Sequence, residues 1–260
     1  MRIMCCLKPV PKPGSVKVDP ETHTLKREES ELVLNPYDRY ALEAAVELAE
    51  KTNGKVVAVS MAPPNAKDIL LEAFAFGADE LVLLSDRAFA GADTLATSYT
   101  LACAAKKLGP FDLIVCGKVS VDGETAQVGP ELAAWLGLPS VTWVKDIKPL
   151  NDSLELIRTR EFGEEKIKAK PPLVITIEHE ANVPRPPSIK RLLKQDEVEV
   201  KILSAGDIGA KEEYLGLNGS PTQVIDTFAP EYHGKREIIS GPPEEVSERL
   251  LSILKERGLI

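Results

Sequence analysis

From residue 2 to residue 136, short apolar runs alternate with helix-like stretches, and this alternation constrains the fold more than any other feature. Strands are expected at residues 2–6, 56–60, 80–84 and 112–116, and helices at 35–53, 67–76, 93–108 and 126–136. The first run is apolar at every position after Arg2, as in a strand covered on both faces. The alternation predicts a doubly wound α/β fold with a mainly parallel sheet.

Beyond Gly137 the rhythm changes, because strand-like stretches follow one another without helices between them. They span residues 140–147, 154–159, 166–169 and 173–177, and short turns link them. This pattern predicts an antiparallel meander or hairpin attached to the parallel sheet. A short helix at 188–194 and a strand at 198–203 are expected to close a main domain that spans residues 1–204.

Residues 205–260 are expected to form a C-terminal arm. The arm ends in a helix that opens near Pro242 and carries Val246, Leu250, Ile253 and Leu254 on one apolar stripe. Such a helix needs a surface to lie on. That surface could belong either to its own domain or to a partner subunit, and both alternatives stay open.

Composition and charge limit the functions open to the chain. Its 260 residues carry a net charge of −8, which disfavours nonspecific binding to nucleic acids and anionic membranes. The four cysteines lie in apolar segments, and no spacing of Cys or His suits a metal site. No apolar run could span a membrane and the start lacks the features of a signal peptide, so we expect a cytoplasmic protein.

The two common phosphate-binding fingerprints, GxGxxG and GxxxxGK[ST], are missing, so a site has to be located from topology. In a doubly wound sheet, ligands bind beyond the carboxyl ends of the strands where the winding reverses. A strand order of 3-2-1-4-5 places that reversal between the strands that end at Cys6 and Cys116. The loops that begin at Leu7 and Gly117 are then expected to face each other.

The loop that begins at Gly117 is the most informative stretch. Gly117, Gly123 and Gly129 would allow tight turns and the close approach of a ligand. Thr125, Gln127 and the free N–H groups at the next helix start could hold a phosphate. A surface turn with ordinary capping residues is the alternative.

Two acidic residues in the same loop, Asp122 and Glu124, would repel a phosphate. Their expected role is to accept hydrogen bonds, either from ribose hydroxyls or from the backbone of the loop itself.

Other strand ends and helix starts supply further candidates. Lys8 suits a phosphate or a flavin carbonyl, although a solvated lysine is the simpler interpretation. Thr94 and Thr97 lie at a helix start that could face the same crevice, and Asp93 there is explained by capping alone. Met61 could pack against a base or against the core.

Seven fragments of the sequence, taken together, resemble the beta subunit of an electron transfer flavoprotein. They are CLKPVP at 6–11, KVDPETHTL at 17–25, NPYDRYALEAAVEL at 35–48, VSMAPP at 59–64, GADTLATSY at 91–99, the Gly117 loop, and PPSIKRLLK at 186–194. The resemblance implies an adenine nucleotide alpha hydrolase-like fold for residues 1–204. It also implies an alpha-subunit partner that carries the main FAD and is embraced by residues 205–260.

In that family the crevice of the beta subunit holds either a structural AMP or a second FAD. By position, the resemblance implies these contacts: Cys6, Lys8, Asn35, Pro36, Tyr37, Asp38, Met61, Gly117, Lys118, Val119, Asp122, Gly123, Glu124, Thr125, Ala126, Gln127 and Val128. Thr94 and Thr97 join them from the helix start described above. Because the flavin supplies the chemistry, we assign no catalytic residue and no metal ligand.

The nucleotide loop departs from members that only relay electrons, which usually have DDDxNQTG there. This chain has DGETAQVG at residues 122–129, a form similar to the electron-bifurcating group. Gly123 and Ala126 would leave room for a larger ligand. The resemblance then implies an FAD that oxidises NADH and splits its electrons. One goes to ferredoxin or flavodoxin, and the other to a quinone or an acyl-CoA dehydrogenase type of acceptor.

The family's partner-recognition loop falls on a proline-rich segment here. Its residues are Pro184, Arg185, Pro186, Pro187, Ser188 and Ile189. Any association with a membrane is expected only through other subunits. The open alternatives are an AMP-holding relay subunit and a stand-alone nucleotide-binding or signalling module, since fold alone fixes no function. A nucleotide hydrolase is disfavoured because the phosphate motifs are missing.

Overall fold

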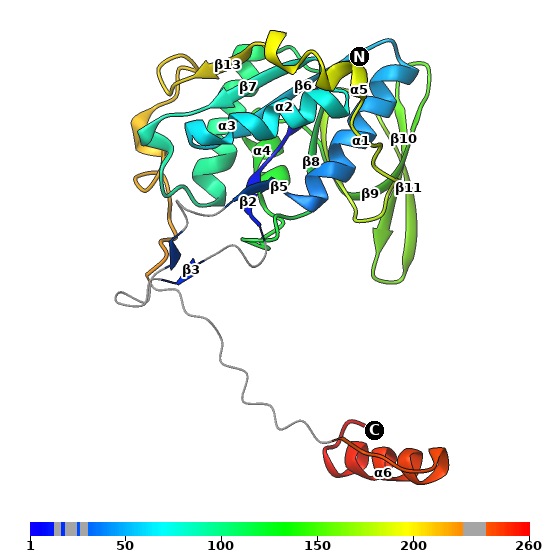
Figure 1. Ribbon diagram of the computed structural model, residues 1–260. Coiled ribbons are helices and arrows are strands. Elements are labelled where there is room, and N and C mark those ends of the chain that lie inside the picture. The colour runs from blue at the N-terminus through cyan, green and yellow to red at the C-terminus, as the bar shows by residue number, and fades with distance from the viewer. Residues whose placement is uncertain (13–16, 19–24, 27–30, 226–237) are drawn as a thin grey trace. The chain divides into compact units, whose positions relative to one another are not determined.

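The computed structural model describes residues 1–12, 17–18, 25–26, 31–225 and 238–260 (Figure 1). Most of the KVDPETHTL fragment, residues 19–24, lies outside the described residues. The chain divides into a large unit, Met1–Ile225, and a small one, Asp226–Ile260. The small unit contains helix α6 (Pro243–Glu256).

One nine-stranded sheet organises the large unit, in the order β11-β10-β9-β12-β8-β1-β6-β7-β13. The strands are β1 (Arg2–Cys6), β6 (Lys55–Met61), β7 (Glu80–Leu84), β8 (Leu113–Gly117), β9 (Ser140–Pro149), β10 (Leu154–Arg160), β11 (Gly163–Ala169), β12 (Leu173–Ile177) and β13 (Val200–Leu203). Two short ladders lie outside it, β2 (Pro9–Pro11) with β5 (Leu32–Leu34) and β3 (Lys17–Val18) with β4 (Leu25–Lys26).

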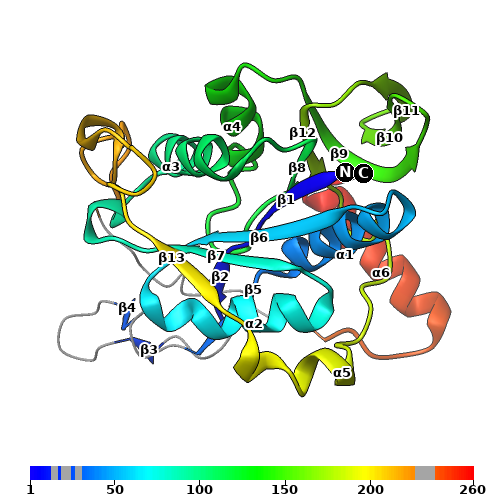
Figure 2. The same ribbon diagram turned by 90° about the horizontal axis from the view of Figure 1, so that it is seen from above.

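The helices are α1 (Pro36–Lys51), α2 (Lys67–Phe76), α3 (Thr94–Leu108), α4 (Val128–Leu136) and α5 (Ile189–Leu192). Single 3-10 turns lie at Pro64–Ala66, Arg87–Phe89, Gln195–Glu197 and Glu212–Tyr214. α1 and α2 cover one face of the sheet, where they pack on Ile3 and Cys5. α3 and α4 cover the other face and pack on Met4 and Cys6 (Figure 2). The predicted doubly wound fold is confirmed.

The expected position of residues 173–177 was wrong. β12 is not part of the antiparallel extension but a parallel strand of the central sheet, inserted between β8 and β9. Within the nine-stranded sheet, the antiparallel pairs are β9 with β10 and β10 with β11. Leu173, Val174 and Ile175 are fully buried, as in a strand covered on both faces, but the short link before them gave the appearance of a hairpin.

Residues 205–225 belong to the large unit, where Ile208 and Leu215 are buried, and the division falls after Ile225 instead of after residue 204. The described part of the chain contains no helix that combines the length and the apolar character needed to cross a membrane.

Candidate functional site

A cleft of about 760 Å³ lies beyond the carboxyl ends of β1 and β8, where the winding of the sheet reverses. Its volume falls within the range of pockets for small molecules and cofactors. Leu7 and Gly117 both line it, so the two loops face each other as the topology predicts.

Most of the predicted site residues line this cleft. They are Cys6, Lys8, Asn35, Asp38, Met61, Thr94, Thr97, Gly117, Lys118, Val119, Gly123, Thr125, Ala126, Gln127 and Val128. Pro36, Tyr37, Asp122 and Glu124 do not line it. Tyr37 instead lies against His179, with ring centroids 5.6 Å apart.

Asn35 ties the two loops together, although it stands at the N-cap position of α1. Its side chain makes no cap hydrogen bond. The Nδ2 atom donates to the Val119 carbonyl at 2.9 Å, and Oδ1 accepts from the Val121 N–H at 3.3 Å. The Asn35 N–H donates to the Lys8 carbonyl at 3.0 Å. One side chain and one amide therefore join the ends of β1 and β8.

Asp38 reinforces this junction from the first turn of α1. Its Oδ2 accepts from the Lys8 N–H at 2.7 Å. Burial raises the pKa of Asp38 to about 7, although the hydrogen bonds it accepts and the Lys8 charge act in the opposite direction. A side chain at Gly117 would overlap Asp38 and Tyr37, so glycine here serves packing against α1 and not the approach of a ligand.

Lys8 is held by the Gly117 loop, residues 117–129, which is called the nucleotide loop after the function proposed below. Its Nζ lies 2.6 Å from Asp122 Oδ1 and 3.2 Å from Ser120 Oγ. Burial would raise the pKa of Asp122, but the bond and charge of Lys8 lower it overall. Both side chains are more than a third exposed, at 47% and 37%, so the pair adds little to stability and can be rearranged at small cost when a ligand binds.

Lys118 is turned toward β9 and β12. Its Nζ lies 2.8 Å from Glu178 Oε1 and 4.5 Å from the centroid of the Trp143 ring. Trp143 has a left-handed backbone, with φ of 61°, where the pairing of β9 with β12 shifts register. A bulky residue rarely adopts this conformation, and the irregularity re-aims the indole toward Lys118.

Two helix starts face the cleft, and they differ. At α3, Asp93 Oδ1 accepts from the N–H groups of Leu95 and Ala96, at 3.0 and 3.1 Å. At α4, the N-cap residue Gln127 makes no side-chain cap hydrogen bond. The first amides of α4, at Val128 and Gly129, are therefore the ones available for an anion.

Glu131 places a carboxylate close to the start of α4. Oε1 accepts from Thr94 Oγ1 at 3.2 Å, and Oε2 accepts from Ser98 Oγ at 3.3 Å. α3 thus orients the acid through two hydroxyl groups and fixes α4 beside it.

The residues of the nucleotide loop that adopt a left-handed backbone conformation are not its glycines. Glu124 and Ala126 have φ of 49° and 56°, whereas Gly123 is not left-handed. A side chain at Gly129 would run into the methyl group of Thr176 on β12, so this glycine also serves packing. Of the three glycines expected to admit a ligand, Gly123 is the least crowded, because a side chain there would meet only the Ser120 hydroxyl group, at 3.3 Å.

Several lining residues were not predicted. They are Ala92, Leu95, Leu101, Cys116, Glu131, Pro221, Thr222 and Val224. The strand ends and helix starts could have been found from the topology. The segment 221–224 could not, because it lies far along the chain and has no periodic pattern.

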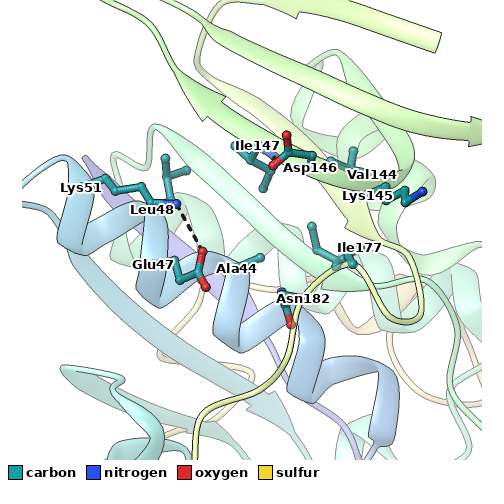
Figure 3. A pocket seen from close by; sticks show the side chains of 11 residues that line it. Ala44, Glu47, Leu48, Lys51, Val144, Lys145, Asp146, Ile147, Ile177 and Asn182 are labelled. Carbon is teal, nitrogen blue, oxygen red and sulfur yellow. Dashed lines mark hydrogen bonds and ion pairs between the residues drawn. The ribbon is translucent and has the colours of Figure 1, made fainter. Parts of the chain in front are cut away.

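A second hollow lies between α1 and β9 and is much smaller (Figure 3). Its volume is about 40 Å³, and the Lys51–Glu47 ion pair at 3.2 Å lies along its wall. This space suits ordered water and not a cofactor. The described residues also contain no group of three or more His, Cys, Asp or Glu side chains that could hold a metal ion.

The fold and the position of the cleft define the class of protein, an α/β protein of the doubly wound type with a ligand cleft at its switch point. Residues 22–208 match the electron transfer flavoprotein domain. The chain belongs to the electron transfer flavoprotein family and is of the beta-subunit type.

Three relatives illustrate the match. The chain is 44% identical over 260 residues to electron transfer flavoprotein subunit beta of Clostridium acetobutylicum, with both chains fully covered. It is 44% identical over 262 residues to the caffeyl-CoA reductase-Etf complex subunit CarD of Acetobacterium woodii, again with full coverage of both. It is 41% identical over 238 residues to protein FixA of Azorhizobium caulinodans, covering 88% of this chain and 85% of the relative.

Proposed function

We propose that the cleft binds FAD and that the chain acts as the beta subunit of an electron-bifurcating electron transfer flavoprotein, with NADH as the electron donor. The observation that carries the proposal is the cleft itself. It joins an uncapped helix start to a volume of about 760 Å³ at the switch point. When bound, FAD supplies the redox chemistry, and the chain supplies position and electrostatics.

The residues present fit a nucleotide. The free amides of Val128 and Gly129, with the side chains of Thr125 and Gln127, suit a phosphate group. Lys8 adds a positive charge that Asp122 holds in place until a ligand competes for it. These groups are common to AMP and FAD, so they support a nucleotide without deciding its size.

The volume of the cleft and the small residues Gly123 and Ala126 favour FAD over AMP. The cleft is roomier than a mononucleotide needs. Gly123 has no side chain and leaves the space before Ser120 Oγ unfilled, and Ala126 keeps the loop narrow while adopting a left-handed conformation. Asp and Asn at these positions, as in relay members, would fill that space and add charge.

We further propose an alpha-subunit partner that carries a second FAD and is contacted by the C-terminal arm. Ferredoxin or flavodoxin is the proposed low-potential acceptor, and a quinone- or acyl-CoA-linked dehydrogenase is the high-potential one. The name of the relative from Acetobacterium woodii joins a caffeyl-CoA reductase to an Etf complex, which supports an acceptor of the acyl-CoA type.

The proposed partner-recognition segment, residues 184–189, is anchored at Arg185 and at Ser188, whose N–H donates to the Ala75 carbonyl at 2.9 Å, and apolar side chains in and beside it are exposed. Arg185 is fixed by Glu43 and Glu50, with N···O distances of 3.0 and 2.7 Å. Val183 and Ile189 are 89% and 75% exposed. A rigid anchor with apolar side chains beside it suits contact with another protein.

Copurification of the chain with its alpha partner, followed by counting of nucleotides, tests the proposal. We expect two FAD per heterodimer and loss of flavin absorbance on anaerobic addition of NADH. One FAD with one AMP would overturn the FAD assignment, and no nucleotide in the cleft would overturn nucleotide binding altogether.

A matched variant sharpens the experiment. The double change Gly123→Asp and Ala126→Asn gives the loop the relay-type residues, and Asn tolerates the left-handed conformation of residue 126. We expect this variant to exchange FAD for AMP and to lose its response to NADH. Retention of FAD at wild-type levels would show that these two residues do not select the ligand.

A further inference from the structure

The segment 220–224 forms one wall of the cleft, although it is far from the other lining residues in sequence. Pro221, Thr222 and Val224 line the cleft beside the start of α3. The segment has no helix or strand, and Val224 is 77% exposed. Its position against the cleft therefore has to come from particular contacts.

The chain just before this segment is packed closely on residues 88–93. A side chain at Gly216 would overlap the carbonyl groups of Ala88 and Ala90, and one at Gly219 would overlap the backbone of Tyr214. The buried Ser220 hydroxyl accepts from the Asp93 N–H at 2.8 Å and lies 2.6 Å from the Gly216 carbonyl. Residues up to 220 are thus fixed by backbone packing.

Beyond Ser220 the segment depends on a single side chain. Asp93 Oδ2 accepts from the Thr222 N–H at 3.1 Å and from the Thr222 hydroxyl at 2.8 Å. Within the described part of the chain, no hydrogen bond of residues 223–225 follows, and Ile225 is 98% exposed. The two bonds from Thr222 to Asp93 form the last fixed point of this wall.

Asp93 is suited to the task because it is charged and already oriented. Its other oxygen caps α3 through Leu95 and Ala96, so the carboxylate plane is fixed before Thr222 approaches. Burial would raise its pKa, but the hydrogen bonds from Ala96, Thr222 and Leu95 lower it overall. Hydrogen bonds to an ionised group are stronger than those between neutral groups.

We infer that Asp93 and Thr222 form a clasp that holds the wall 220–224 against a bound nucleotide and sets the rate at which the nucleotide leaves. Both are positioning residues, because they act through the wall. The inference rests on the proposed function, since it requires a nucleotide in the cleft. It applies to FAD and AMP alike.

Two substitutions weaken the hydrogen bonds between Thr222 and Asp93 while Asp93 Oδ1, or its counterpart, still caps α3. Asp93→Asn keeps Oδ1 as the acceptor for α3, but its amide nitrogen cannot accept from Thr222. Thr222→Val removes the hydroxyl group at nearly constant shape. Thr222→Ser restores the hydroxyl group and should restore the clasp.

Asp86 provides a matched control away from the cleft. It also bridges two segments, accepting from the N–H groups of Ala88 and Ala205 at 3.0 Å each. Asp86→Asn changes the same kind of bond at a carboxylate that, within the described residues, accepts no hydrogen bond from residues 220–224. Melting temperatures of all four variants report whether any of them has lost its fold.

The experiment follows release of FAD from the heterodimer by the rise in flavin fluorescence after dilution, or release of AMP if AMP is the ligand found. We expect Asp93→Asn and Thr222→Val to release nucleotide at least about tenfold faster, with Thr222→Ser and Asp86→Asn close to wild type. Faster protease cleavage within residues 221–225 should accompany faster release.

Release at the wild-type rate from both clasp variants would overturn the inference, and so would equal acceleration by Asp86→Asn. A wild-type heterodimer that holds no nucleotide in this chain would instead overturn the proposed function. The two failures are therefore distinguishable.

Discussion

The two walls of the cleft satisfy their polar groups in opposite ways. On the wall formed by residues 91–97 and 220–224, Asp93 accepts hydrogen bonds from the first amides of α3 and from both donors of Thr222, its N–H and its hydroxyl group. On the wall formed by residues 117–129, α4 starts without a side-chain cap, and Glu124 and Ala126 are left-handed. The difference shows which wall the proposed nucleotide would stabilise, because only the wall 117–129 offers unpaired helix amides and left-handed residues to a ligand.

The largest expected effect on stability comes from disturbing the packing of the wall 117–129 against β12. Gly129→Ala would push a methyl group into Thr176 on β12, which should lower the free energy of unfolding by about 1–3 kcal/mol. Chemical denaturation measures this. Adding Thr176→Ser removes the opposing methyl group and should restore most of the loss. Gly123→Ala is the control, because its methyl group would meet only the movable Ser120 hydroxyl group, at 3.3 Å. Equal stability of the two alanine variants would contradict the packing argument.

The next effect comes from giving the uncapped helix start a negative charge. Gln127→Glu keeps the shape of the side chain but adds a carboxylate where a phosphate is expected. We expect nucleotide affinity to fall about tenfold, or about 1.4 kcal/mol, with little change in stability. Titration with FAD and AMP measures it. Gln223→Glu places the same change on the opposite wall and should leave the affinity near that of wild type.

Two aspartates should respond to pH with opposite sign. The raised pKa of Asp38 means that the folded state keeps a proton between pH 3.8 and about 7 after the unfolded chain has lost it. Its contribution to stability therefore falls as pH rises through this window. The pKa of Asp93 is lowered, so its contribution is present above pH 3.8 and is lost as pH falls below that value.

Unfolding measured against pH separates the two aspartates. The difference between wild type and Asp38→Asn should become less favourable to wild type from pH 3.8 to 7. The difference between wild type and Asp93→Asn should become more favourable to wild type as pH rises from the acid side. Parallel curves for the two variants would contradict the opposite directions of the two pKa shifts.

The smallest effect tests backbone strain. Ala126→Gly removes the penalty for a left-handed alanine, so we expect the chain to gain up to about 1 kcal/mol of stability. Ala92→Gly on the opposite wall should instead lose roughly 0.5–1 kcal/mol through added freedom of the unfolded chain. Thermal unfolding measures both, and the same sign for both changes would refute the contrast.

The sequence predicted the winding of the sheet and the place of the cleft, because apolar periodicity and helix-start residues are local signals. It did not predict that Asn35 bridges two loops, because a helix-start asparagine has the same appearance whether it caps or reaches across. It also misplaced β12, because strand pairing depends on contacts between distant residues. No local sequence pattern marks the wall at 220–224, because its position depends on hydrogen bonds to Asp93, which is distant in the sequence.

The position of β12 has a consequence for the order in which the protein is made. β12 covers the outer edge of β8, yet the ribosome delivers β9, β10 and β11 first. The nascent chain therefore carries an open edge on β8 until residue 177 has emerged, and such edges are prone to wrong pairing. Since Gly129 packs on Thr176, the nucleotide loop also lacks its support until then.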